Sequence, residues 1–245
     1  MGEETTSGPA AVTARGISMT GPWGQVFGPL DIDIQAGGVT VLVGPPGSGR
    51  TALLMNMAGR MTPSAGTLTV FGHSKPRQIF AFSALAGVEQ LDAICASVTV
   101  RDLITEQCRW DAPWYRIVHR AREADRDAMC TPVFGDLPLP QLDAYVEQLD
   151  ELTGLLLRIA LANTRRPALL VVGNIDEVSN DADRRMLIQR LVALGHNQTV
   201  ITASSNQVPE GLGITAHVDI AAHADTAVAA DRQRSLHGRH EKRTD

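Results

Sequence analysis

The sequence predicts an α/β fold built on a mostly parallel β-sheet, because strongly apolar runs alternate with helical segments along the chain. The β-branched run at residues 39–43 leads directly into a glycine-rich loop and then into an apolar helix. Two further hydrophobic runs, residues 168–172 and 199–202, are separated by a helical segment. Strands buried on both faces of a parallel sheet have such continuous apolar runs, since neither face meets water.

Local patterns define the other elements in chain order. Alternation at residues 30–34 predicts a half-buried strand, and another strand is expected at residues 67–71. The middle of the chain, roughly residues 90–150, has a mainly helical pattern interrupted by prolines. These prolines are Pro113, Pro132, Pro138 and Pro140. Later helices are expected at residues 149–163 and from Asp181 to Gly195, where the glycine ends the second helix.

Composition and the chain ends exclude several classes of protein. The net charge of −5 gives no reason to expect a nucleic-acid partner, which requires a basic surface. No apolar run approaches the ~18 residues of a membrane span, and the polar start is not a signal peptide, so we expect a soluble protein. Residues 1–12 and 231–245 lack apolar periodicity, which predicts a mobile N-terminus and a mobile charged tail. Cys95, Cys108 and Cys130 form no C-x-x-C pair and are expected to be idle thiols in a reducing compartment.

The glycine-rich loop has the spacing of a phosphate-binding P-loop. Its glycines let successive backbone N–H groups turn inward, and the following helix directs the positive end of its dipole at the phosphates. The hydroxyl of Thr51 suits a Mg²⁺ ligand, whereas Arg50 replaces the usual lysine with a planar fork of the same charge. Because a strand precedes the loop and a helix follows it, we favour a nucleotide site over a simple turn. The residues expected to bind the nucleotide in this loop are Gly44, Pro45, Gly47, Ser48, Gly49, Arg50, Thr51 and Ala52.

The stretch from Gly44 to Gly72 resembles the ATP-binding cassette domain of ABC transporters. After the P-loop come Leu53-Leu54, Ala58-Gly59, Pro63-Ser64-Ala65-Gly66-Thr67-Leu68 and Phe71-Gly72, in the order and spacing of that family. The resemblance extends from about Val12 to His223. It implies a P-loop NTPase fold over residues 13–230, with a small antiparallel β subdomain and an inserted helical subdomain at roughly 90–155.

The same resemblance implies cofactors and partners. ATP and Mg²⁺ are the expected cofactors. The expected partners are a membrane permease and a second ATP-binding cassette, in a homo- or heterodimer. The resemblance also implies a cytoplasmic location, with the chain held at the inner face of the cell membrane through the permease. An aromatic side chain stacks on adenine in this family, and Trp23 lies near that position, although packing against the domain edge is an equal alternative.

Several positions depart from the family pattern in ways that bear on hydrolysis. In the family a glutamine follows a strand that comes after the Phe-Gly segment. Here the apolar residues 79–82 are expected to form that strand, which puts Ser83 or Ala84 at the glutamine position and leaves Gln90 several residues too late. The signature segment reads Leu152-Thr153-Gly154-Leu155-Leu156, in which Thr153 and Gly154 would face a γ-phosphate across a dimer. We favour the alternative that this segment only opens an apolar helix. The switch histidine is replaced by Ser204.

The family's Asp-Glu pair is also missing in the straight register. Gly173 and Asn174 occupy those positions after the strand, and neither is a base. A shifted register would use Asp176 and Glu177 instead. We favour the straight register, because the residue directly after the apolar run lies beside the nucleotide. Asp176 and Glu177 then fall in a loop toward the dimer partner. Asn180 or Asp181 lies near the family's D-loop aspartate, and a role of Asp181 as the N-cap of the next helix is the alternative.

These observations predict an ATP-binding subunit of an ABC-type transporter with weak or absent hydrolysis. The parts that hold the nucleotide are kept, and the groups that orient water are lost. One alternative is a regulatory nucleotide-binding protein without a transport role. Another is a divergent, active ATPase that uses Asp176 and Glu177.

Overall fold

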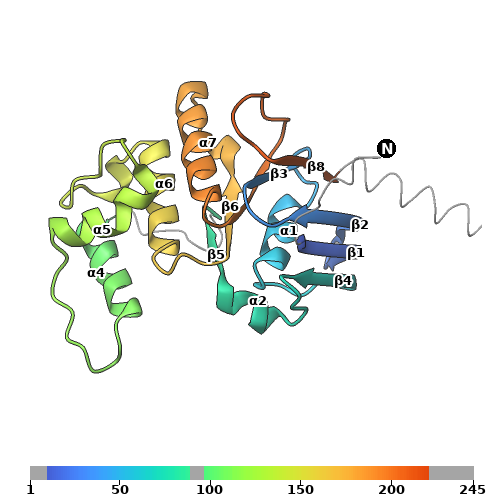
Figure 1. Cartoon of the computed structure of the whole chain (residues 1–245), viewed down its shortest axis with the longest axis horizontal. Coiled ribbons are helices and arrows are strands. Elements are labelled where there is room, and N and C mark those ends of the chain that lie inside the picture. The colour runs from blue at the N-terminus through green and yellow to red at the C-terminus, as the bar shows by residue number, and fades with distance from the viewer. Residues whose placement is uncertain (1–9, 89–96, 221–245) are drawn as a thin grey trace, which may run out of the picture.

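A five-stranded parallel sheet and a three-stranded antiparallel sheet organise the molecule (Figure 1). The structure is a computed structural model that describes residues 10–88 and 97–220. Its parallel sheet, separate antiparallel sheet and helices confirm the predicted α/β class. Residues 1–9 and 231–245, which were expected to be mobile, lie outside the described residues. Residues 10–12 belong to a strand in which Ala11 and Val12 are buried, so the predicted mobile N-terminus is wrong at its last three positions.

The antiparallel sheet has the order β2-β1-β4 and is built around a long hairpin. Its strands are β1 (Ala10–Gly21), β2 (Gly24–Gln35) and β4 (Ala65–Val70). Leu30, Ile32 and Ile34 are buried, whereas the aspartates between them are exposed, as the alternating sequence predicts. Pro22 and Trp23 form the turn between β1 and β2.

The parallel sheet brings the ends of separate strands to one edge. Its strands are β3 (Val39–Val43), β5 (Ser83–Ala86), β6 (Leu169–Asn174), β7 (Thr199–Ser204) and β8 (Ala216–Asp219). They have the order β5-β6-β7-β3-β8, and every neighbouring pair is parallel. The segments that follow β3, β6 and β7 therefore emerge at the same edge, where parallel sheets place their ligands.

Six α-helices and two short 3₁₀ helices are described. The α-helices are α1 (Arg50–Met57), α2 (Pro76–Phe82), α4 (Val100–Asp111), α5 (Glu123–Phe134), α6 (Glu151–Ala162) and α7 (Asp181–Gly195). The 3₁₀ helices are η1 (Val146–Gln148) and η2 (Ile175–Glu177). Two expectations are corrected here. Pro132 lies inside α5 and does not interrupt the helical segment. The N-cap of α7 is Asn180, not Asp181. Within the described ranges, no helix is long and apolar enough to cross a membrane.

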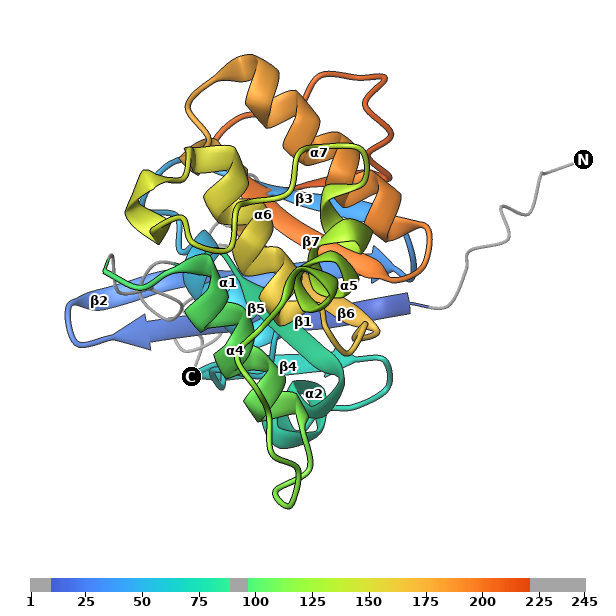
Figure 2. The same cartoon turned by 90° about the vertical axis from the view of Figure 1, so that its left-hand side faces the viewer.

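The parallel sheet separates two hydrophobic cores. On one face, Leu42, Val171 and Ile201 pack with the antiparallel sheet and with Leu53 and Leu54 of α1. On the other face, the alternate residues of the same strands join a cluster formed mainly by the helices α4 to α7. Figure 2 shows α4, α5 and α6 in front of the sheet, and Figure 1 shows them on the other side of the sheet from the antiparallel hairpin. The P-loop follows β3 at the edge of the parallel sheet and leads into α1, which packs on the face shared with the antiparallel sheet.

Candidate nucleotide-binding site

The P-loop connects β3 to α1 and leaves the helix N-terminus open. Gly49 is the N-cap of α1 with φ 80°, and no acidic residue occupies the first turn. A Cβ atom on Gly49 would lie 2.4 Å from the carbonyl oxygen of Val26, so a glycine is needed for the loop to pack on β2. Gly47 also has a positive φ of 82°, but a Cβ atom there would face open space. Open backbone N–H groups at a helix start favour an anion.

Two buried polar atoms of this loop have no hydrogen-bond partner among the described residues. They are the Oγ of Ser48 and the Nη1 of Arg50. Most buried polar groups in proteins are hydrogen-bonded, and exceptions point to a ligand or to solvent. Phosphate oxygens would accept from both groups, so the residues present fit a nucleotide phosphate. Thr51 is exposed at the same loop, and its hydroxyl is accessible to a Mg²⁺ ion bound beside the phosphates.

Arg50 is held by residues that follow the neighbouring strands. Its Nη2 donates to the Oγ of Ser205 at 3.1 Å, and its Nη1 lies 3.7 Å from a carboxylate oxygen of Asp176. The Arg50 side chain is only 10% exposed. Ser205 follows β7 and Asp176 lies in η2 after β6, so the parallel sheet itself brings these residues together. A point charge on a flexible lysine would not span these partners in the same way.

The carboxylate of Asp176 is already hydrogen-bonded on both oxygens. It accepts from the backbone N–H of Ser205 at 2.6 Å and from the Oγ of Ser204 at 3.0 Å. Partial burial alone would raise the pKa of Asp176, but these hydrogen bonds and the nearby Arg50 outweigh burial and lower it. Asp176 is therefore a charged anchor and a weak base.

The position of Asp176 corrects one sequence-based expectation. The straight register placed Asp176 and Glu177 together in a loop toward the dimer partner. Instead, Asp176 lies beside the P-loop arginine, because η2 turns the chain back toward β7 directly after β6. Glu177 instead pairs with Arg158 of α6 at 3.8 Å. The two carboxylates do not act as an adjacent pair.

Gly173 and Asn174, the two straight-register positions, do not supply a carboxylate pair: Gly173 lacks room for a side chain, and Asn174 has an amide. A Cβ atom on Gly173 would lie 1.7 Å from the carbonyl oxygen of Gly87, so no side chain fits there without a backbone shift. The Gly173 carbonyl also accepts a 2.7 Å hydrogen bond from Thr202. Asn174 is half-buried and uses its side-chain oxygen to accept from the N–H of Asp176. Position 173 is therefore closed to an aspartate.

The glutamine register is a second correction. Residues 79–82 belong to the helix α2, which Pro76 opens, and the strand β5 begins only at Ser83. The Oγ of Ser83 donates to the carbonyl of Ala58 and anchors this strand to the end of α1. Ser83 and Ala84 are thus inside the strand, and the segment after it starts at Gly87. Gln90, which was judged too late, falls in that segment but lies outside the described residues.

The signature segment opens a helix whose N-terminus is occupied by an acid. Asp150 is the N-cap of α6 and accepts from both the N–H and the Oγ1 of Thr153, each at 2.8 Å. Leu152, Leu155 and Leu156 are buried in the core. A carboxylate at this cap competes with a phosphate for the same N–H groups. The interpretation as the start of an apolar helix accounts for these contacts.

Trp23 is a predicted site residue on the β1–β2 turn, and Ser205 is a contact of Arg50 that the sequence did not predict. The side chain of Trp23 is fully exposed, so it does not pack on the domain edge, and its stacking on adenine stays a prediction. The hairpin that carries it lies against the P-loop through Val26. Ser205 was missed by sequence reasoning, because only the order of strands shows that the residue after β7 faces the loop after β3.

Comparisons with known proteins agree with this geometry. A sequence model of the ABC transporter family matches residues 27–201. The cytochrome c biogenesis ATP-binding export protein CcmA of Pseudomonas putida is 32% identical over 132 residues, which cover 54% of this chain and 61% of that protein. The aliphatic sulfonates import ATP-binding protein SsuB 3 of Rhodococcus jostii is 29% identical over 203 residues, covering 76% of this chain and 74% of that protein. A dimeric bacterial ABC transporter cassette has a similar fold, with a TM-score of 0.63 and 14% identity over 80% of this chain and 88% of that one.

Proposed function

Because the chain belongs to the ABC transporter family of ATP-binding subunits, we propose that it binds ATP with Mg²⁺ at its P-loop and hydrolyses ATP slowly or not at all. The observation that carries the binding proposal is a pair of buried donors in that loop, Ser48 Oγ and Arg50 Nη1, that make no hydrogen bond with the described residues, although Nη1 lies 3.7 Å from Asp176. Both would donate to phosphate oxygens. Arg50 stays oriented by Ser205 and Asp176, so little side-chain entropy is lost when the phosphates bind.

The weak hydrolysis follows from what surrounds the P-loop. A Mg²⁺ ion, held through Thr51 and the phosphates, would neutralise developing negative charge during phosphoryl transfer. Orienting the attacking water needs a further group. Asp176 is a weak base with both oxygens occupied, Gly173 has no side chain, and Ser204 donates its hydroxyl to Asp176. Phosphoryl transfer depends on such positioning, so its loss slows hydrolysis.

The partners and location follow from the relatives. ATP-binding proteins of this family work with membrane permeases and dimerise, as the dimeric cassette illustrates. We propose the same for this chain, which would then reside in the cytoplasm at the inner face of the membrane. Whether its cassette partner is a second copy or a different chain is decided by mass measurement of the ATP-bound complex.

Thermal unfolding with and without nucleotide tests the binding proposal. ATP at about one hundred times its Kd stabilises a protein by about 2.7 kcal/mol, which raises the Tm of a chain of this size by roughly 5–10 °C. The Arg50→Ala variant is expected to lose most of this shift, and Arg50→Lys to keep part of it. Arg185→Ala removes an exposed arginine of α7 and is the matched control. A wild-type Tm that ATP does not change, or an equal shift in Arg50→Ala, contradicts the proposal.

A divergent active ATPase is the second candidate, because Asp176 lies beside Arg50. Phosphate release from Mg²⁺-ATP separates it from the first. Release by the wild-type chain that Asp176→Asn and Glu177→Gln abolish would establish the active enzyme. Release no faster than from Arg50→Ala leaves nucleotide binding as the function.

A further inference from the structure

The loop between α4 and α5, residues 112–122, concentrates exposed aromatic and basic side chains. Trp114 is 96% exposed, and Tyr115 and Ile117 are exposed beside it. Trp110, at the end of α4, is also exposed. Elsewhere in the described ranges only Trp23, Phe80 and Tyr145 are large, apolar and exposed, and the Arg60 guanidinium covers the Phe80 ring at 3.6 Å. Large exposed apolar groups gathered in one place mark an interaction surface.

The charge of the same loop has one sign. Residues 112–122 contain Arg116, Arg120, Arg122 and His119 and no acidic residue, in a chain whose net charge is −5. Arg120 lies 3.8 Å from Asp102, but both side chains are mostly exposed, and such a pair is easily exchanged. Arg116 and Arg122 form no ion pair with any described residue. This surface is therefore complementary to a negatively charged one.

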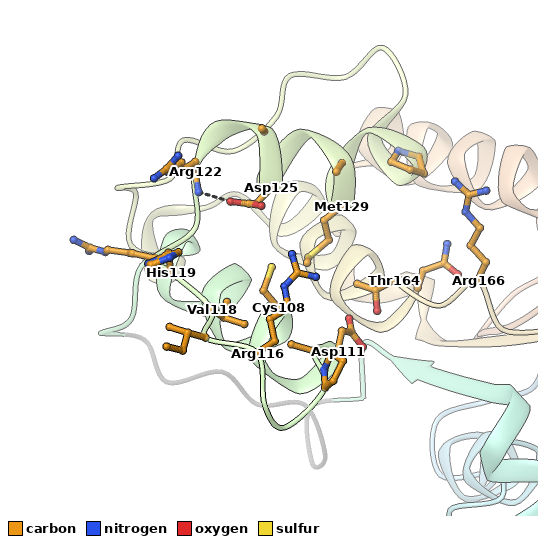
Figure 3. Close-up of a pocket in the computed structure, with 18 residues that line it drawn as sticks. Cys108, Asp111, Arg116, Val118, His119, Arg122, Asp125, Met129, Thr164 and Arg166 are labelled. Atoms are coloured by element: carbon orange, nitrogen blue, oxygen red, sulfur yellow. Dashed lines mark hydrogen bonds between the residues drawn. The ribbon is translucent and has the colours of Figure 1, made fainter.

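The loop stands away from the body of the molecule. Figures 1 and 2 both show it projecting beyond α4 and α5. A hollow of about 670 Å³ lies behind it, lined by residues of α4, α5 and the loop itself (Figure 3). Arg116 points into this hollow toward Cys108 and Met129. Trp114 and Tyr115 are not among its lining residues, and their rings contact each other edge to face at 5.9 Å.

We propose that residues 112–122 form a membrane-contact loop that binds the headgroup region of an anionic phospholipid bilayer. Tryptophan and tyrosine prefer this region, because one end of each side chain is apolar and the other donates a hydrogen bond. Trp114, Tyr115 and Ile117 enter between the headgroups, and the exposed Arg120 and Arg122 pair with lipid phosphates. The loop is convex and its charged side chains are all basic, so it matches a uniformly anionic surface. Its contact with lipid does not depend on nucleotide binding.

Single-tryptophan variants test this proposal, because the chain has three tryptophans. The Trp23→Phe/Trp110→Phe variant keeps only Trp114, and Trp110→Phe/Trp114→Phe keeps only Trp23, which is equally exposed but lies in the β1–β2 turn. Vesicles of phosphatidylcholine with phosphatidylglycerol are expected to shift the Trp114 emission to shorter wavelength and to leave Trp23 unchanged. Vesicles of phosphatidylcholine alone are expected to change neither. An unchanged Trp114 emission, or an equal shift of Trp23, overturns the proposal.

Charge variants test the electrostatic part by co-sedimentation with the same vesicles. Arg120→Gln/Arg122→Gln is expected to weaken binding by roughly 25-fold, since each arginine near an anionic membrane contributes about fivefold. Arg77→Gln/Arg185→Gln makes the same charge change at exposed positions on α2 and α7 and is expected to have little effect. Equal weakening by both variants contradicts a specific loop. Binding of the loop to a purified permease without any binding to vesicles would show a protein surface and overturn the membrane assignment.

Discussion

The P-loop and the turn after β6 lie at the same edge of one parallel sheet, but they differ in what they leave available to a ligand. The P-loop has an open helix N-terminus, no first-turn acid and two buried donors that make no hydrogen bond with the described residues. At the turn after β6, Gly87 blocks any side chain at Gly173, and the following carboxylates are engaged by arginines. The P-loop thus has a geometry that suits phosphates, whereas Gly173 in the neighbouring strand has no side chain that could orient water.

A similar contrast separates the starts of α1 and α6. Glycine caps α1 and leaves its N–H groups accessible, whereas Asp150 caps α6 and uses them. The hydrogen bonds from Thr153 lower the pKa of Asp150 although partial burial opposes them, so this cap is charged at neutral pH. Only the first of the two helices is arranged to receive an anion.

The largest expected effect comes from restoring a carboxylate at the closed position. In Gly173→Asp, the new side chain meets the Gly87 carbonyl and brings a charge into a buried site. The cost is about 4 kcal/mol or more, which lowers Tm by roughly 10 °C, with no gain in hydrolysis. Asn174→Asp at the neighbouring half-buried position is the control and should unfold close to the wild type. A stable Gly173→Asp protein with faster phosphate release would show that position 173 accepts a carboxylate that supports hydrolysis.

The two P-loop glycines with positive φ provide a matched pair. Gly49→Ala combines left-handed strain with contact against Val26 and Phe27, and we expect a loss of about 3 kcal/mol. Gly47→Ala has the strain alone, because its Cβ faces open space, and should cost about 1 kcal/mol. Urea unfolding of both variants measures the difference. Equal losses would show that the contact with β2 is unimportant.

The effect of Asp176→Asn is expected to be close in size to that of Gly47→Ala, and it depends on pH. The pKa of Asp176 is lowered in the folded state from its ordinary value of 3.8, so its stabilisation is complete above that value and disappears as the pH falls toward the lowered pKa. At pH 7 the variant should be less stable by about 1–2 kcal/mol, because hydrogen bonds to a charged group are lost. Tm measured against pH for both proteins should converge in acid. A difference that stays constant with pH would contradict the role of the Asp176 charge.

Much of the fold was predictable because it depends on local sequence. The apolar runs at 39–43 and 199–202 predicted β3 and β7, and the pattern from Asp181 to Gly195 gave the bounds of α7. The prediction of secondary structure failed where an apolar segment is compatible with both a strand and a helix. Residues 79–82 are apolar enough for a strand, but Pro76 starts a helix there, and this shifted the position of the expected glutamine.

The sequence by itself determined the P-loop, because its glycines, the preceding strand and the following helix are contiguous and act within one turn of chain. It also determined that Gly173 and Asn174 are not carboxylates. Only the tertiary structure decided where Asp176 and Ser205 lie. They approach Arg50 because strand order places the ends of β6, β7 and β3 side by side, and no local pattern carries that order.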